Sequence, residues 1–409
     1  MSAKAEFSRG WRVVAGGAIG AAFSISALPF YTLGVFLKPI AAATGWSREA
    51  IQWGFAVQML VVLAVTWMWG AAVDRYGARP VALISQVGLA AGLMLLPVMA
   101  ASFGSGISGW YLGWVIVAVF GAGTGQATWT RGISGWFDKA RGAALGLALF
   151  GTGIAAVFAP PIVTAIIDAR GWSMGYFVLG ASVIVIGLPL VALLFHDAPR
   201  PAIGAADLPG ASRDMALRDR RFWVMLLVFS AVTFGVAGII PNLVPLLTDR
   251  GLDPATAALY AGFTGLSVMG GRVAAGFLLD RLWAPHVAVG FLAFPAAACF
   301  LLAGSTLPSG PVIGLAATLV GLAAGAEFDL IAYMAGRYFG MKNYGFIYGV
   351  QIAGVLAATG FAPPVFGHIH GVYGSYDPAL IGAGVTFLVA PLFLLTLGRY
   401  PRFEADADS

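Results

Sequence analysis

Long apolar stretches alternate with short polar connections along the whole chain. Twelve of these stretches are long enough to cross a hydrocarbon layer of ~30 Å, which takes about 20 residues of helix. They begin near Val13, Ile51, Arg79, Trp110, Gly142, Trp172, Phe222, Ala255, His286, Pro311, Gly345 and Pro378. The pattern predicts an all-α integral membrane protein with 12 transmembrane helices.

The second half of the sequence repeats the first. Matching residues recur 206 positions later in the early spans and 202 or 203 later in the others, in the pairs Gly70 and Gly276, Asp74 and Asp280, Arg75 and Arg281, Phe137 and Phe339, Gly142 and Gly345, and Gly171 and Gly374. Two six-helix pseudo-repeats, residues 1–195 and 222–409, are the simplest explanation. The polar stretch 196–221, with three prolines, is then the cytoplasmic linker.

Composition and charge narrow the class further. The 409 residues are 59% hydrophobic and 10% charged, with a mean hydropathy of +0.87, which is too apolar for a soluble fold. Of the 23 lysines and arginines, 17 fall on one side of the predicted spans, and only Lys38, Arg48, Arg170 and Arg250 fall on the other. Because cytoplasmic loops carry the basic excess, both termini are predicted to be cytoplasmic. We expect a multi-pass protein of the bacterial inner (plasma) membrane.

Several function classes lack the residues that they need. The pI of 9.4 follows from the loop asymmetry, so no nucleic-acid partner is expected. The single cysteine, Cys299, excludes an internal disulfide and a cysteine metal cluster. The sequence holds no zinc-binding His/Glu spacing, nucleophile elbow or nucleotide-binding fold. We therefore expect no enzyme activity, no cofactor and no metal site, in a protein that works as a monomer in the lipid bilayer.

One charged residue lies inside an otherwise uncharged span. Arg272 is roughly 12 Å from the polar end at Asp280 and Arg281, which places it near the middle of the membrane. A guanidinium there costs about 2.5 to 3.5 kcal/mol on insertion scales. Such a residue usually faces a watery cavity, and its expected ligand is an anion. The alternative is a structural ion pair with an acid on a neighbouring helix.

Three motifs resemble those of a known family. The run from Gly70 to Arg79 matches the loop signature of the major facilitator superfamily, between its second and third helices. The run from Trp136 to Gly151 resembles the fifth-helix signature of the monocarboxylate transporters, and the Asn-Tyr-Gly-Phe run at 343–346 resembles the oxalate/formate exchangers of the same branch. The resemblance covers the whole chain. It implies the major facilitator superfamily fold, with a substrate site at the midplane between two rocking halves.

The resemblance assigns a role to Arg272. These transporters carry a substrate-binding arginine in helix eight, followed four residues later by glycine, as Arg272 is by Gly276. A planar guanidinium can bind a carboxylate through two parallel hydrogen bonds. The oxalate exchanger has a second cation in helix eleven where this chain has Gln351, so one carboxylate is expected, unless Gln351 faces another helix. Animal monocarboxylate transporters have an aspartate and a lysine where this chain has Val268 and Tyr31, so their coupling chemistry does not transfer.

Two acids are available to carry a proton within the membrane. Glu327 and Asp329 lie in the tenth span, about 200° apart around a helix, so both cannot face one cavity. Asp329 shares a face with Tyr333, and we favour that pair for the cavity and Glu327 for contacts within the second half. The reverse assignment stays open, as does a salt bridge from either acid to Arg131 or Arg272.

Further polar residues at similar depth are expected to shape the substrate site. They are Gln126 and Trp129 in the fourth span, Tyr31 in the first and Asn242 in the seventh. Tryptophan and tyrosine also populate membrane interfaces, and a lone glutamine often satisfies a neighbouring backbone, so each is weak evidence alone. His368 and His370, near the outer end of the eleventh span, are interpreted as interfacial, with pH sensing as the alternative.

The loop motifs predict a gate. In the resembling transporters the motif aspartate, here Asp74, meets the N-terminus of helix eleven and locks the halves when the cavity faces outward. The predicted gating residues are Asp74, Arg75, Arg79, Asp280, Arg281 and Arg131. Together the sequence predicts a proton-coupled symporter of a small monocarboxylate that works by alternating access. The alternatives are a carboxylate exchanger and a non-transporting membrane sensor.

Overall fold

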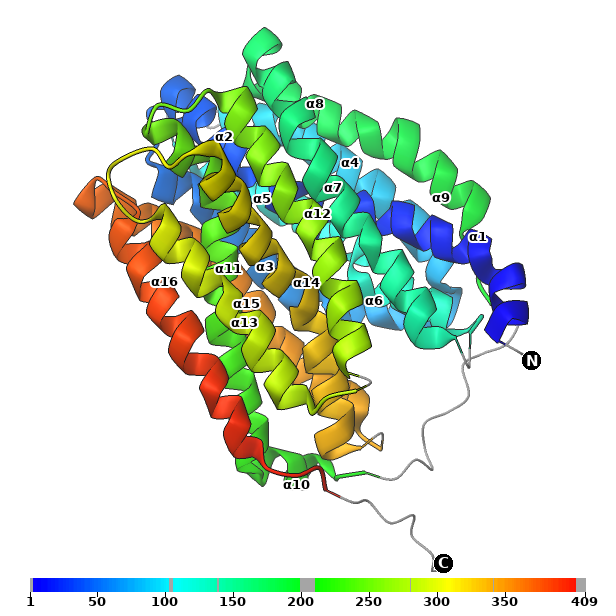
Figure 1. Ribbon diagram of the computed structural model, residues 1–409. Helices are drawn as coiled ribbons and strands as arrows, with labels where there is room; N and C mark the ends of the chain where they lie inside the picture. Colours follow the sequence, from blue (N-terminus) through cyan, green and yellow to red (C-terminus); the bar gives the residue numbers. More distant parts are fainter. Residues whose placement is uncertain are drawn as a thin grey trace, which may run out of the picture.

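The computed structural model describes residues 3–102, 106–137, 140–198, 210–279, 281–340 and 342–401. Long helices pack side by side along a common direction (Figure 1). The first group of helices comprises α1 (Ala3–Ala22), α2 (Leu28–Thr44), α3 (Arg48–Tyr76), α4 (Ala78–Ser102), α5 (Ser108–Gly121), η1 (Ala122–Thr124), α6 (Gln126–Ser134), α7 (Arg141–Arg170), α8 (Trp172–Ser182), η2 (Val183–Gly187) and α9 (Leu188–Leu194). The second group comprises α10 (Arg213–Arg218), α11 (Arg220–Asp249), α12 (Pro254–Leu279), α13 (Ala284–Leu302), α14 (Gly310–Phe339), α15 (Tyr344–Tyr373), α16 (Asp377–Val389) and η3 (Ala390–Leu397).

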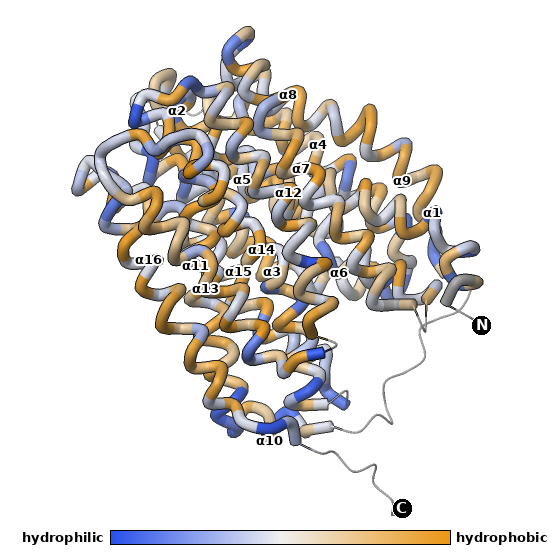
Figure 2. Tube along the Cα trace, in the orientation of Figure 1, coloured by the Kyte–Doolittle hydropathy of each residue, from blue (hydrophilic) through white to orange (hydrophobic). Residues whose placement is uncertain are grey.

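Ten of the twelve predicted stretches are confirmed as continuous helices that are long and apolar enough to cross a membrane, within the ranges described. The first and fourth stretches are interrupted instead, at residues 23–27 between α1 and α2 and at residues 122–125 between α5 and α6. Figure 2 shows apolar residues along much of the helices and many polar residues near helix ends and connections. The chain is therefore an all-helical, multi-pass membrane protein.

The two interruptions contact each other, which explains how the membrane interior tolerates them. Thr124 Oγ1 accepts a hydrogen bond from the Ile25 backbone nitrogen at 3.0 Å and donates one to the Gly121 carbonyl at 2.7 Å. The Trp129 indole donates to the Thr124 carbonyl at 2.7 Å, and Gln58 donates to the Ile25 carbonyl at 3.3 Å. Backbone groups that leave a helix inside a bilayer need such partners.

The helix ends define two sides of the molecule. The starts of α1 and α10 and the end of η3 lie toward the lower and right-hand edges of Figure 1, which we call the terminal side. The opposite, far side holds the end of α2 and the start of α3, joined by a short turn. Gly45 closes α2 with a left-handed φ of 73°, and the Ser47 side chain caps α3. This turn brings Lys38 and Arg48 to the far side together.

The two groups touch along a seam in which glycines allow close approach. The seam consists of α2 against α11, α3 against α15, and α7 against α12. A Cβ atom at Gly265 would lie 2.7 Å from the Gly153 carbonyl oxygen and 2.7 Å from the Val157 nitrogen, and one at Gly360 would lie 2.8 Å from Met59. These contacts lie near the middle and in the far half of the helices. A second hydrophobic cluster, on the terminal half of the first group, consists of first-group residues alone in the described part of the chain.

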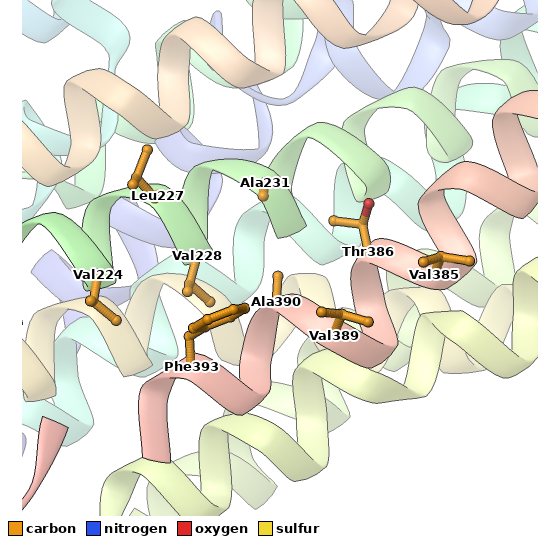
Figure 3. Close-up of a pocket in the computed structure, with 9 residues that line it drawn as sticks. All are labelled: Val224, Leu227, Val228, Ala231, Val385, Thr386, Val389, Ala390 and Phe393. Atoms are coloured by element: carbon orange, nitrogen blue, oxygen red, sulfur yellow. The ribbon is translucent and has the colours of Figure 1, made fainter. Parts of the chain in front are cut away.

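The surface carries a groove away from the seam. Figure 3 shows it between α11 and the α16–η3 segment, and its volume is about 460 Å³. Its lining is apolar apart from Thr386. Side chains such as Leu227 (67% exposed) and Phe393 (56% exposed) are suited to contact with lipid. The groove has no charged lining residue, so it is unlike an anion site.

Candidate functional site

Arg272 and Asp329 form the centre of the candidate site. Arg272 lies in the terminal half of α12, and only 5% of its side chain is exposed. Asp329 extends from the adjacent helix α14 with 30% of its side chain exposed, and its Oδ2 lies 3.7 Å from Arg272 Nε. This distance is short enough for an ion pair, the alternative role expected for Arg272, but it is too long for a hydrogen bond.

The guanidinium retains unused hydrogen-bonding capacity. Arg272 Nε and Nη1 are buried and have no hydrogen-bond partner among the residues described. Leaving buried donors unpaired is costly, on the order of 1–3 kcal/mol for each group. A buried, charged group with free donors is therefore a strong candidate for binding an anionic ligand, because the ligand supplies the missing acceptors.

The two predicted acids have different environments. Glu327 is 2% exposed, and the Thr233 hydroxyl in α11 donates a hydrogen bond to its Oε1. Asp329, two residues later on α14, is the acid beside Arg272. A separation of about 200° around the helix accounts for the difference. The structure thus brings one acid to the arginine and directs the other into the packing between α14 and α11.

Two tyrosines on other helices interact electrostatically with the pair. Tyr31 in α2 lies within electrostatic range of Arg272, and Tyr348 in α15 lies within range of both Arg272 and Asp329. Tyr348 stacks on Tyr344 with 5.5 Å between ring centroids, and the Tyr344 hydroxyl donates to the Ala332 carbonyl at 3.3 Å. Sequence reasoning missed Tyr348. Its signal was the spacing of four from Tyr344, which puts both rings on one helix face.

Other predicted site residues have different neighbours. Gln351 is buried and donates to the Phe222 carbonyl at 2.9 Å, so it faces α11, as the alternative for this residue had it. Asn242 lies in the seam, where it accepts a hydrogen bond from Gln52 at 2.8 Å. Trp129 is fully buried and packs edge-on against Phe195. A contact between Trp129 and a ligand therefore requires this packing to open.

Two predicted site residues remain partly accessible. Gln126 is the first residue of α6 and follows the extended residue Gly125. Tyr333 lies one turn beyond Asp329 on α14 and is half-buried. The spacing of four places Tyr333 on the same face as Asp329.

The predicted gating residues have partners within their own group. Arg131 pairs with Asp74, and more than half of each side chain is exposed. Arg79 donates to the Ala192 carbonyl at 2.6 Å. Arg75 lies over the Tyr76 ring, and Arg281 donates to the Phe277 carbonyl at 3.2 Å. Asp280 lies outside the described residues.

The far side has a contrasting set of contacts, which sequence reasoning missed. Asp249, the last residue of α11, pairs with Lys38 at 2.8 Å and with both terminal nitrogens of Arg48 at 2.5 and 2.8 Å. The His370 ring lies 3.3 Å from both Asp249 and Arg48. Tyr376 accepts from Arg48 at 3.4 Å, and burial raises the pKa of this phenol to about 12, which keeps it neutral. Lys38 and Arg48 lie about 200 positions before Asp249 in the sequence, and no local sequence pattern predicts that their side chains meet.

The described residues contain no group of three or more His, Cys, Asp or Glu side chains that could hold a metal ion. The arrangement has instead the parts of an anion site, a guanidinium with free donors and a neighbouring carboxylate. Arg272 and Asp329 lie on α12 and α14, which pack against each other, and α12 also packs against α7 of the first group.

Comparison with known proteins identifies the family. The sequence matches the Major Facilitator Superfamily over residues 19–350. It is 27% identical to "Monocarboxylate transporter 11" of Homo sapiens, over 95% of this chain and 83% of that protein. It is 26% identical to "Monocarboxylate transporter 13" of Bos taurus, over 98% of this chain and 92% of that protein.

Solved structures share the fold. The E. coli fucose:proton symporter FucP superposes with a TM-score of 0.59 at 18% identity, over 96% of this chain and 99% of that one. A bacterial homologue of the human lysosomal transporter Spinster gives a TM-score of 0.63 at 17% identity, over 95% and 94%. The chain therefore belongs to the major facilitator superfamily, a family of transporters rather than enzymes, and its sequence relatives include monocarboxylate transporters.

Proposed function

We propose that the protein is a secondary active transporter that moves a small monocarboxylate together with a proton by alternating access. The observation that carries the proposal is Arg272, a buried guanidinium with two unpartnered nitrogens and a single carboxylate, Asp329, 3.7 Å away. The similarity to monocarboxylate transporters supports the same substrate class.

Charge balance connects substrate binding to the proton. In the empty site Arg272 and Asp329 together carry no net charge. A substrate carboxylate that binds Arg272 adds a negative charge in a poorly hydrated site, which costs several kcal/mol unless it is compensated. Protonation of Asp329 removes one negative charge and also releases Arg272 from the one carboxylate within ion-pair distance among the described residues. The loaded and empty sites then have the same net charge, so substrate and proton move together.

The same charge balance favours a substrate that has a single carboxylate. A second carboxylate needs a second cation, and the candidates for this role are engaged elsewhere. Gln351 is neutral and bonds to the Phe222 carbonyl, and Arg131 pairs with Asp74. Tyr31 from the first group and Tyr348 from the second supply hydroxyls near the guanidinium. In the proposal Tyr31, Tyr333 and Gln126 shape the site, and contacts by Trp129, Asn242 and Gln351 require other conformations.

Alternating access follows from movement of two units about this site. The proposed units are residues 1–195 and 222–409, with 196–221 as the linker and 12 spans in total. Both termini are assigned to the cytoplasm of a bacterial inner membrane, in a monomer. An excess of basic residues at the terminal side supports this orientation. The described terminal side includes Arg9, Arg12, Arg75, Arg79, Arg220, Arg221, Arg281, Arg337 and Arg399, against Lys38, Arg48, Arg170 and Arg250 at the far side.

Uptake into proteoliposomes tests the proposal. The substrates are radiolabelled lactate, pyruvate, a short fatty acid and an aromatic acid, with and without an inward proton gradient. We expect gradient-stimulated uptake of a monoanion by the native protein, almost none by Arg272→Gln, and substantial uptake by the matched variant Arg131→Gln. Loss of one charge-assisted partner costs about 2 kcal/mol or more, which is roughly 30-fold in affinity.

Each alternative gives a different result. A carboxylate exchanger takes up label only when an anion is loaded inside, independently of the proton gradient. A non-transporting sensor binds the acid in detergent and accumulates none in vesicles. Uptake by Arg272→Gln at the native rate would contradict the assignment of the site.

A further inference from the structure

The far side of the seam concentrates charged contacts between the two groups. Asp249, at the end of α11 in the second group, faces Lys38 of α2 and Arg48 of α3, both in the first group. Arg48 binds the carboxylate with both terminal nitrogens, at 2.5 and 2.8 Å. This bidentate geometry is the strong form of an arginine–carboxylate pair. Only 19% of the Arg48 side chain and 25% of the Asp249 side chain are exposed, so water screens the pair less than an open surface pair.

Two further contacts reinforce this junction. Glu49, next to Arg48 in α3, lies 2.9 Å from His368 of α15. One turn further along α3, Gln52 donates to Asn242 of α11 at 2.8 Å. Each contact joins the first group to the second. A row of polar contacts therefore runs from the far surface into the seam, and glycines allow the helices to approach beneath it.

The terminal side lacks a corresponding row in the described part of the chain. Among the described residues, every ion pair that joins the two groups lies on the far side. The Asp74–Arg131 pair lies on the terminal side, and both of its residues belong to the first group. In the observed conformation, the two groups are therefore held together by ion pairs at the far side. Opening at that side requires Asp249 to leave Lys38 and Arg48, because these residues belong to groups that separate.

We propose that Asp249, Lys38 and Arg48 form a latch that holds the transporter closed at the far side, so that breaking the latch shifts the protein toward conformations open at that side. The inference goes beyond the proposed function because it concerns the relative stability of two conformations. It applies whichever carboxylate is carried and whether or not a proton accompanies it.

The chain offers a matched control for a latch variant. Arg250 and Asp377 form an ion pair at 2.9 Å on the same side, but both belong to the second group. Asp377→Asn removes a carboxylate from an arginine pair of similar exposure without touching a contact between the groups. Asp249→Asn removes the carboxylate that joins them.

Distances between spin labels measure the opening directly. Labels are placed at Ala43→Cys in α2 and Ala255→Cys in α12, two exposed far-side positions, in a Cys299→Ser background. A second pair, Ala143→Cys and Gly345→Cys, reports on the terminal side. Double electron–electron resonance on the full-length protein in nanodiscs without substrate then gives the population of each distance.

We expect Asp249→Asn to raise the ratio of far-side-open to far-side-closed protein about fivefold, the upper value for an exposed ion pair. The terminal-side pair moves closer together in the same protein. Asp377→Asn leaves both distributions as in the native protein. The double variant Lys38→Gln with Arg48→Gln reproduces the Asp249→Asn shift, and adding Asp249→Asn to it produces no further shift, because all three residues act in one interaction.

Two results overturn the latch. One is a native distance distribution in both Asp249→Asn and the Lys38/Arg48 double variant. The other is an equal shift in Asp377→Asn, which would indicate general loosening of the far side. If Asp249→Asn does not fold, as judged by size-exclusion chromatography, the double variant decides. Because no substrate is present, failure here is separate from failure of the proposed transport function.

Discussion

Arg272 Nε and Asp329 Oδ2 face each other across the contact between α12 and α14 at 3.7 Å. At this distance the charges attract each other, but no hydrogen bond fixes the guanidinium. Two of its nitrogens stay without a partner in the described structure. Arg272 is therefore suited to exchange the carboxylate of Asp329 for the carboxylate of a ligand.

If the substrate carboxylate replaces Asp329 at Arg272, the two intramembrane acids, Asp329 and Glu327, should have different roles. Asp329→Asn is expected to abolish stimulation of uptake by an inward proton gradient, because the amide cannot carry the proton. Exchange of internal for external substrate should persist, since Arg272 still binds the anion. The matched variant Glu327→Gln keeps an acceptor for Thr233 and should retain gradient-stimulated uptake. Both activities are measured in proteoliposomes. Coupling that survives in Asp329→Asn and disappears in Glu327→Gln would reverse the assignment.

Tyr348 is expected to contribute to substrate affinity. Its hydroxyl lies in electrostatic range of Arg272 and Asp329, whereas the Tyr344 hydroxyl is already bonded to the Ala332 carbonyl. If Tyr348 donates to the bound carboxylate, Tyr348→Phe removes that hydrogen bond, worth about 1 kcal/mol, so KM should rise about fivefold with little change in maximal rate. Tyr344→Phe should leave KM within about twofold. Equal effects of both substitutions on KM would show that ring packing, not the Tyr348 hydroxyl, sets affinity.

The glycine seam predicts a position-specific effect within one helix. Gly265→Ala places a Cβ 2.7 Å from the Gly153 carbonyl oxygen, whereas a Cβ at Gly270 of the same helix meets nothing within 4 Å. Gly265→Ala should destabilise the conformation that is closed at the far side by about 1–3 kcal/mol, the usual range for overpacking. Gly270→Ala should be neutral or slightly stabilising, because alanine favours helix.

Thermal unfolding in detergent and the far-side label distances distinguish these two variants. Gly265→Ala is expected to lower the unfolding temperature or lengthen the far-side distance. An unfolding temperature and distance equal to those of Gly270→Ala would mean that the helices in the seam can separate at no cost.

The Asp74–Arg131 pair predicts a kinetic effect without a loss of binding. Both side chains are more than half exposed, so the pair contributes roughly 0–1 kcal/mol to stability. The family resemblance predicts that Asp74 contacts the start of the eleventh span, at Tyr344, when the terminal side closes. Asp74→Asn should therefore slow uptake while the Kd for substrate stays native. Equilibrium binding in detergent and initial uptake rates measure the two quantities. A raised Kd with an unchanged rate would contradict the gating role.

Part of the candidate site could be predicted from local sequence. Arg272 was recognisable because a single guanidinium in an apolar span has a high insertion cost. Asp329 and Glu327 were recognisable for the same reason, and their spacing showed that only one could face a given cavity. Tyr348 was not singled out, because its one signal, the spacing of four from Tyr344, shows that the two rings share a helix face but not that this face meets Arg272.

The sequence by itself determined the positions of ten continuous spans, the family and the intramembrane charges, because hydrophobic length and local motifs depend on neighbouring residues alone. The tertiary structure decided which partner each polar residue meets. It placed Asp329 rather than Glu327 beside Arg272, and it joined Asp249 to Lys38 and Arg48. These choices depend on the rotation of each helix about its axis and on the approach of two helix groups. Neither is fixed by the hydrophobic pattern of a single span, because every face of a buried helix is apolar enough to pack.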